Sequence, residues 1–240
     1  MIELLNINGT AISEIDYVEY LGTDFGDTEI TNYNAWGKNS IAPRFVPIRR
    51  AQFQTAEVRF LIRGVPTQVQ FEETITKLVM MLRSTSVPEL NYNGFSFVGH
   101  CTDVKVNRII KSQIAEVFLT VEGCKCVIET ITNPERGGDH TYFEDVLIES
   151  PIKINFTVPS GLTPRTVTIE GETVNFGGLE AGNYSWNGLT HTLDKEGTAT
   201  SSSGMSALVF PYAKVGGTSI RIATGFPSSG LSITCYRRLL

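Results

Sequence analysis

Short runs of alternating apolar and polar residues occupy most of the chain, and this period of two is typical of half-buried β-strands. In residues 56–63, three apolar side chains alternate with mostly charged ones. One segment departs from the pattern, because apolar residues between Phe71 and Leu82 recur at the spacing of a single helix face. We therefore expect one amphipathic α-helix over about residues 71–84, covering a sheet of returning strands. These strands are predicted at 95–98, 103–110 and 115–123.

The second half of the chain has a different texture, and a break precedes it. Residues 132–139 contain Pro134 and the pair Gly137-Gly138, which interrupt a strand, so we place a domain boundary between residues 133 and 134. Downstream, short strands separated by turns follow at regular spacing, which indicates a β-sandwich. The predicted strands are 152–158, 165–170, 173–176, 183–186, 189–193, 206–210, 218–223 and 231–236.

The predicted fold class is therefore mainly β, with two domains. Residues 1–133 form an N-terminal β-sandwich-like domain with one long helix, and residues 134–240 form a C-terminal sandwich. An apolar fraction of 41% with 19% charged residues is ordinary for a globular chain. The net charge of −5 provides no general basic field, so we expect neither nucleic acid nor membrane as a partner. The amino terminus lacks the pattern of a secretion signal, so we expect a protein made in a cytosol.

Four cysteines are spread along the chain, and we expect reduced, buried thiols. A zinc site from His100, Cys101, Cys124 and Cys126 is conceivable if their strands are neighbours. The spacing disfavours it, because adjacent residues on a strand point to opposite faces and only one residue separates the last two cysteines. We therefore expect no metal and no cofactor.

Sequence motifs of catalysis are absent. The chain has no nucleophile elbow of the G-x-S-x-G type, no phosphate-binding glycine loop and no H-E-x-x-H pair, so we expect no enzymatic activity. A glycoside hydrolase stays open as a remote alternative, since the separation of two carboxylates is a three-dimensional quantity. Solvated surface is the commoner explanation for each candidate pair. These pairs are Glu72-Glu73, Glu144-Asp145 and Glu170/Glu172.

A polar, glycine-rich segment at residues 22–41 is the first of two candidate binding features. Such a segment is typical of a long functional loop or of an arm that becomes ordered on another chain. Tyr33 and Trp36 are its large apolar side chains, and aromatic residues are enriched at interfaces. The alternative is that both rings pack on the core of their own domain.

The second feature lies in residues 183–194, where Tyr184, Trp186 and His191 are close in sequence. Residues 184 and 186 share one face of a predicted strand, which would make a platform of two rings for a sugar. The favoured alternative is that both rings fill the core of the sandwich, where aromatic side chains contribute most.

Several segments, taken in chain order, form a pattern that covers nearly the full length. The amino-terminal segment MIELLNINGTAIS comes first, and FVPIRRAQFQTAEVRFLIRG then leads into the predicted helix FEETITKLVMMLR. The run LNYNGFSFVGHCTDVKVNRIIKSQIAEVFLTVEGCKC follows. The second half contains LEAGNYSWNGLTHTLDKEG and FPYAKVGGTSIRIATGFPSSGLSITCYRRLL. This pattern resembles the distal tail protein family of long-tailed, non-contractile phages.

This resemblance implies a galectin-like C-terminal sandwich and a structural role at the phage tail tip, reached after assembly in the host cytoplasm. It implies a homo-hexameric ring, built mainly by the N-terminal domain, that joins the tail tube protein to a tail-associated or fibre protein. The C-terminal domain would dock a receptor-binding protein or, in some members, bind carbohydrate. The alternative function is a carbohydrate-binding protein that contacts the host cell wall through its C-terminal domain.

Overall fold

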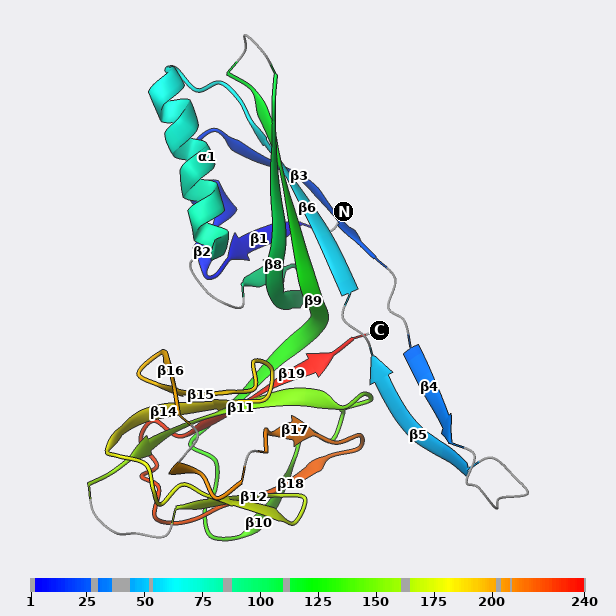
Figure 1. The fold of residues 1–240 in the computed structure, drawn as a ribbon, viewed down its shortest axis with the longest axis vertical. Coiled ribbons are helices and arrows are strands. Elements are labelled where there is room, and N and C mark those ends of the chain that lie inside the picture. Colours follow the sequence, from blue (N-terminus) through cyan, green and yellow to red (C-terminus); the bar gives the residue numbers. More distant parts are fainter. Residues whose placement is uncertain are drawn as a thin grey trace. The chain divides into compact units, whose positions relative to one another are not determined.

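The computed structural model describes residues 3–26, 30–35, 44–51, 54–83, 88–109, 113–160, 165–201, 204–207 and 209–239. The chain divides into two compact units (Figure 1). The first contains Met1–Cys126 with Leu239–Leu240, and the second contains Val127–Arg238. Within the described ranges, the helix is too short and too polar to cross a bilayer.

One antiparallel sheet forms the first unit, in the order β3-β6-β9-β8-β7-β1-β2. A 3-10 turn at Ile12–Glu14 follows β2. The strands are β1 (Leu4–Ile7), β2 (Thr10–Ala11), β3 (Val18–Phe25), β6 (Gln54–Ile62), β7 (Glu89–Tyr92), β8 (Phe95–Arg108) and β9 (Ala115–Thr132), the last of which continues into the second unit.

The predicted helix is present as α1 (Gln68–Arg83) and lies along one face of this sheet (Figure 1). It begins a few residues before the predicted start because Thr67 caps it, accepting the backbone N–H of Gln70 at 3.3 Å. Phe71, Ile75 and Leu78 form its buried stripe.

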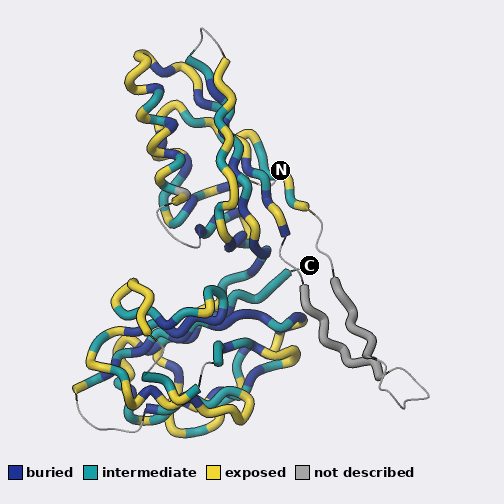
Figure 2. Tube along the Cα trace, viewed as in Figure 1, coloured by how far each residue is buried: buried dark blue, intermediate teal, exposed yellow. Residues whose placement is uncertain are grey.

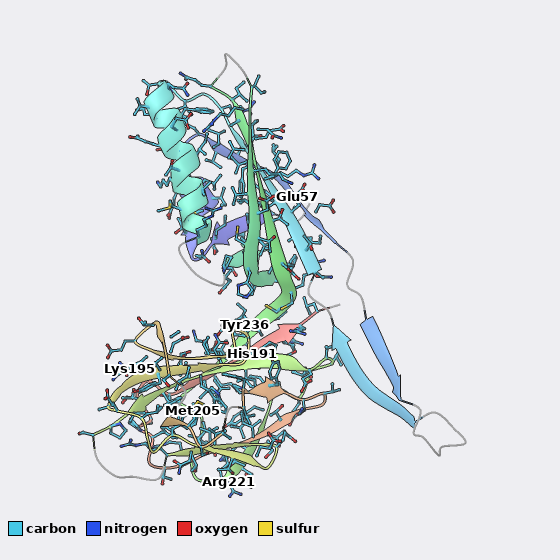
Figure 3. All side chains as sticks on the ribbon, in the orientation of Figure 1. Glu57, His191, Lys195, Met205, Arg221 and Tyr236 are labelled. Carbon is cyan, nitrogen blue, oxygen red and sulfur yellow. The ribbon has the colours of Figure 1, made fainter. Side chains whose placement is uncertain are left out.

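This stripe packs on the alternating buried residues of the central strands. Val58 and Phe60 of β6 and Leu119 of β9 belong to the same core. Glu57, labelled in Figure 3, alternates with them and belongs to the opposite face of β6. In the described part of this unit, α1 thus covers the sheet where a sandwich would place a second sheet.

Two further strands, β4 (Ile30–Ala35) and β5 (Arg44–Ala51), come between β3 and β6 in sequence and pair only with each other among the described strands. We call residues 27–53 the arm. Residues 22–25 complete β3 and residues 30–35 are a strand, so the described part of the predicted polar loop is mostly β-structure. Its β-branched and aromatic residues explain this difference.

The second unit is a two-layer sandwich. One layer has the order β16-β15-β14-β11-β19. In addition, β17 pairs with the start of β11, and the end of β9 pairs with β19. The other has the order β10-β18-β12-β13. The strands are β10 (Asp139–Tyr142), β11 (Ser150–Val158), β12 (Thr166–Ile169), β13 (Glu172–Asn175), β14 (Gly182–Asn187), β15 (Thr192–Lys195), β16 (Thr198–Thr200), β17 (Tyr212–Ala213), β18 (Thr218–Ile222) and β19 (Ser232–Arg238).

The two layers share one hydrophobic core. Ile154 and Phe156 of β11 meet Val167, Val174 and Ile220 of the opposite sheet. Figure 2 shows buried residues gathered along the strands of the first layer. The alternation in residues 152–158 therefore predicted correctly which side chains face inward.

The predicted strand at 206–210 is wrong for its described residues, which are not in a strand; the next strand is β17. Backbone N–H and carbonyl groups of this segment form hydrogen bonds that do not belong to a β-ladder. The backbone N–H of Ser206 donates to the carbonyl of Asn175 at 3.0 Å, and the carbonyl of Val209 accepts the indole N–H of Trp186.

Candidate functional site

Tyr184 and Trp186 do share one face of β14, and that face is the inner one. Only 5% of Tyr184 and 1% of Trp186 are exposed, and both belong to the core of the second unit. The Tyr184 ring stacks on Phe156, with 5.8 Å between centroids, and Trp186 packs edge-on against Phe176 at 5.2 Å. The two rings therefore fill the core, which was the favoured interpretation of this pattern, and they do not form a surface platform.

His191, the third predicted residue, lies elsewhere in the same unit, in the turn between β14 and β15 (Figure 3). Its Nε2 is 2.6 Å from the hydroxyl of Tyr212, a hydrogen-bond distance. Its ring lies 5.1 Å from that of Phe210 between centroids. The structure thus groups His191 with two aromatic residues that the sequence analysis did not select.

These two aromatic residues line a cleft of about 400 Å³, which we call the inter-sheet cleft. The hairpin of β12 and β13 supplies one wall, and the segment that includes β17 supplies another. The buried ring of Trp186 contributes from β14. The lining residues are Glu149, Ile169, Glu170, Glu172, Val174, Trp186, Val209, Phe210, Tyr212 and Lys214.

Most polar groups of the inter-sheet cleft are held in place by neighbours. Lys214 Nζ lies 2.7 Å from Glu149 Oε1, and Glu170 Oε1 accepts the backbone N–H of Ser219 at 2.6 Å. Glu172 also lines the cleft, from an exposed position on β13. The cleft therefore offers carboxylate acceptors, an ammonium donor and apolar walls in one partly open space.

The sequence predicts Glu170 and Glu172 only as a remote carboxylate pair and Trp186 only as a candidate sugar platform or core residue; the other lining residues were missed. One signal was available, because Phe210, Tyr212 and Lys214 follow each other at a spacing of two around a short strand. The other candidate pairs lie elsewhere. Glu72 of α1 pairs with Arg108 at 2.7 Å, and residues 144–145 are exposed in the loop before β11.

The first unit carries a second candidate surface on the sheet face away from α1, which we call the outer sheet face. A hollow of about 320 Å³ lies there at the β-bulge between Tyr20 and Gly22 of β3. Its lining combines apolar and charged side chains, and 48% of Leu21 is exposed. The lining residues are Leu21, Gly22, Thr23, Asp24, Arg59, Glu116 and Phe118.

The predicted subunit contacts in the arm are only partly described. Trp36 lies outside the described residues, and for Tyr33 the structure describes the backbone, which belongs to β4.

The four cysteines form no disulfide. Burial raises the pKa of the Cys235 thiol to about 12, so this thiol stays protonated at neutral pH. Cys101 of β8 lies opposite Val121 of β9, and Cys124 lies opposite Val98. Within the ranges that the structure describes, no three His, Cys, Asp or Glu side chains gather closely enough to hold a metal ion.

No protein-family model matches the sequence, and no curated protein matches it significantly. Solved structures do resemble it over its whole length. A chain of the phage p2 baseplate, in its activated conformation with Sr, aligns with 100% of this chain and 97% of its own length, with a TM-score of 0.56 and 12% identity. The SPP1 Dit protein, described as a paradigm of the hub adsorption apparatus in phages that infect Gram-positive hosts, aligns over 100% of both chains with a TM-score of 0.49 and 10% identity. The chain therefore has the two-domain, mainly β fold of a phage baseplate protein, which is the fold that the resemblance to distal tail proteins implied.

Proposed function

We propose that this chain is a structural component of a phage tail tip. Six copies form a ring that joins the tail tube to a tail-associated or fibre protein and to receptor-binding proteins. The observation that carries the proposal is the shared fold with a phage p2 baseplate chain, which extends over both units. Binding surfaces, and no chemical step, are what such a role requires.

The sheet of the first unit supports this role because it has an uncovered face and an open edge, both of which another subunit could contact. The helix α1 covers one face, whereas the outer sheet face exposes Leu21 and the hollow beside it. β3 ends the strand order in the described residues, so its outer edge is open to another chain. Heterologous contacts that close on themselves produce rings, and in a ring each such edge meets a neighbouring subunit.

Two of the candidate carboxylates are engaged in internal contacts. Glu72 is paired with Arg108, and Glu170 accepts the backbone N–H of Ser219. These contacts support a non-enzymatic role for the two side chains.

The proposal is tested by the mass and shape of the purified protein. Light scattering on a sizing column should give about six times the chain mass of 26.4 kDa, and negative-stain images of that peak should show six-fold rings. A monomer that stays monomeric when mixed with the phage's tail tube protein would contradict the ring.

Removal of the arm tests how the ring closes. Gly26 N–H donates to the carbonyl of Thr55 at 2.8 Å, so β3 and β6 are already adjacent where the arm leaves the sheet. Replacing residues 27–54 by an Asn-Gly turn should leave this hairpin closed, because Gly26 and Thr55 then flank a two-residue turn. We expect a folded monomer in place of the ring, measured by light scattering and circular dichroism.

A matched control shortens another hairpin of the same sheet. The N–H of Ile109 donates to the carbonyl of Ile114 at 3.1 Å, so an Asn-Gly turn in place of residues 110–113 should also close. This variant should still form rings. Intact rings without the arm would reject the arm as a subunit contact, while leaving the ring itself in place.

A second candidate function, carbohydrate binding by the second unit, is favoured by the inter-sheet cleft. The cleft combines aromatic walls with carboxylates and a lysine, whereas the rings that first suggested this function are buried.

A further inference from the structure

We propose that the inter-sheet cleft of the second unit binds a short, neutral saccharide. The inference sharpens the second candidate function by assigning it a site and a ligand class. It does not depend on ring formation, because every residue that lines the cleft belongs to the second unit.

The size and the construction of the cleft suit a small ligand. A volume of about 400 Å³ lies within the range of small-molecule sites, which runs from about 300 to 1,000 Å³. Val174 and Trp186 are core residues, so this part of the lining is rigid. The indole N–H of Trp186 donates to the carbonyl of Val209 at 3.0 Å, which ties β14 to the wall that carries Phe210.

Two half-buried aromatic rings supply the apolar contact that a sugar needs. Phe210 and Tyr212 line the cleft from positions two apart in the sequence. His191 holds both of them, through ring contact with Phe210 and through the hydrogen bond with Tyr212. A preformed wall of this kind loses little conformational freedom when a ligand binds.

The polar groups of the cleft match hydroxyl groups better than they match a single charge. A sugar hydroxyl both donates and accepts. Glu170 and Glu172 can accept from it, and Lys214 can donate to it while still paired with Glu149. A wholly apolar ligand would desolvate these carboxylates without compensation, and a cationic peptide would meet the ammonium group of Lys214.

Calorimetric titration of the full chain tests the assignment. The probes are maltotriose, cellotriose and N,N′-diacetylchitobiose, each raised to about 10 mM, at which a millimolar site is mostly occupied. At least one should bind. Glu172→Gln should weaken that binding about tenfold or more, since a hydrogen bond to a charged group is lost. Phe210→Leu should weaken it as well, with thermal unfolding showing that the fold is kept.

Asp194→Asn is the matched control. Asp194 lines a different hollow, on the open face of β14 and β15, together with Asn155 and Asn183. This variant should bind the sugar like the natural chain. If Asp194→Asn weakened sugar binding and Glu172→Gln did not, the sugar site would be the hollow beside Asp194, and the assignment to the inter-sheet cleft would be wrong.

Other outcomes also overturn it. The assignment is wrong if none of the three sugars binds. It is also wrong if a lysine-rich decapeptide binds instead of a sugar and Glu172→Gln weakens that binding. Release of shorter sugars during the titration would show an enzyme rather than a binding site. Light scattering on the same samples separates this inference from the ring, because sugar binding without rings would contradict only the proposed tail-tip function.

Discussion

Replacing Gly99 or Gly123 by alanine is expected to destabilise the first unit more than other single methyl additions in its sheet. The two glycines lie opposite each other in β8 and β9. A Cβ atom on Gly123 would be 2.1 Å from the carbonyl oxygen of Val98, and one on Gly99 would be 2.2 Å from that of Glu122. Both obstacles are backbone atoms, so the two central strands would have to separate. We expect a loss of about 3 kcal/mol or more in the free energy of unfolding.

Thermal unfolding followed by circular dichroism measures this loss, and Gly26→Ala is the matched control. A Cβ on Gly26 would lie 3.4 Å from the nearest atom, the carbonyl oxygen of Thr55, which is close to ordinary contact. The control should therefore melt within a few degrees of the natural chain, whereas Gly123→Ala should lower the melting temperature by about 10 °C or more. Equal melting temperatures would show that β8 and β9 are not so close at this point.

Trp186→Ala is expected to cost the second unit about 3–5 kcal/mol of stability. The ring is fully buried against Phe176, and its removal would leave a cavity between the two sheets. It would also leave the carbonyl of Val209 without the indole donor. Because the same ring also lines the inter-sheet cleft, loss of sugar binding in this variant would not distinguish a lost contact from a lost fold.

Two further variants make the result interpretable. Trp186→Phe keeps an aromatic ring and should lose only part of the stability, while Leu147→Ala, at a position that is 75% exposed, should change it by less than about 0.5 kcal/mol. Chemical denaturation monitored by circular dichroism compares the three. If Trp186→Ala unfolded like Leu147→Ala, the ring would not be the core residue that the structure describes.

Much of the fold follows from local pattern. The helix face of Phe71, Ile75 and Leu78 and the alternation in β6 and β11 were read correctly, because each period reflects which side of one element is covered. The strand expected at 206–210 failed for a tertiary reason. Trp186 and Asn175, distant in sequence, bind the backbone of that segment.

The candidate site was less accessible to sequence reasoning. Its lining comes from four separate segments, namely the residue before β11, the β12–β13 hairpin, β14 and the residues around β17. Their meeting depends on how the two sheets stack and on where the chain crosses between them, and neither is recorded in the spacing of residues along one strand.

The sequence by itself determined that the chain is mainly β with one amphipathic helix, and that Tyr184 and Trp186 share a strand face. These are local properties, since the period of apolar residues and the geometry of a strand involve only near neighbours. Only the tertiary structure decided that this shared face is buried and that Phe210, Tyr212 and Glu172 line a cleft instead. The physical reason is that burial of a strand face depends on whether another sheet covers it, and that sheet is built from residues far away in the chain.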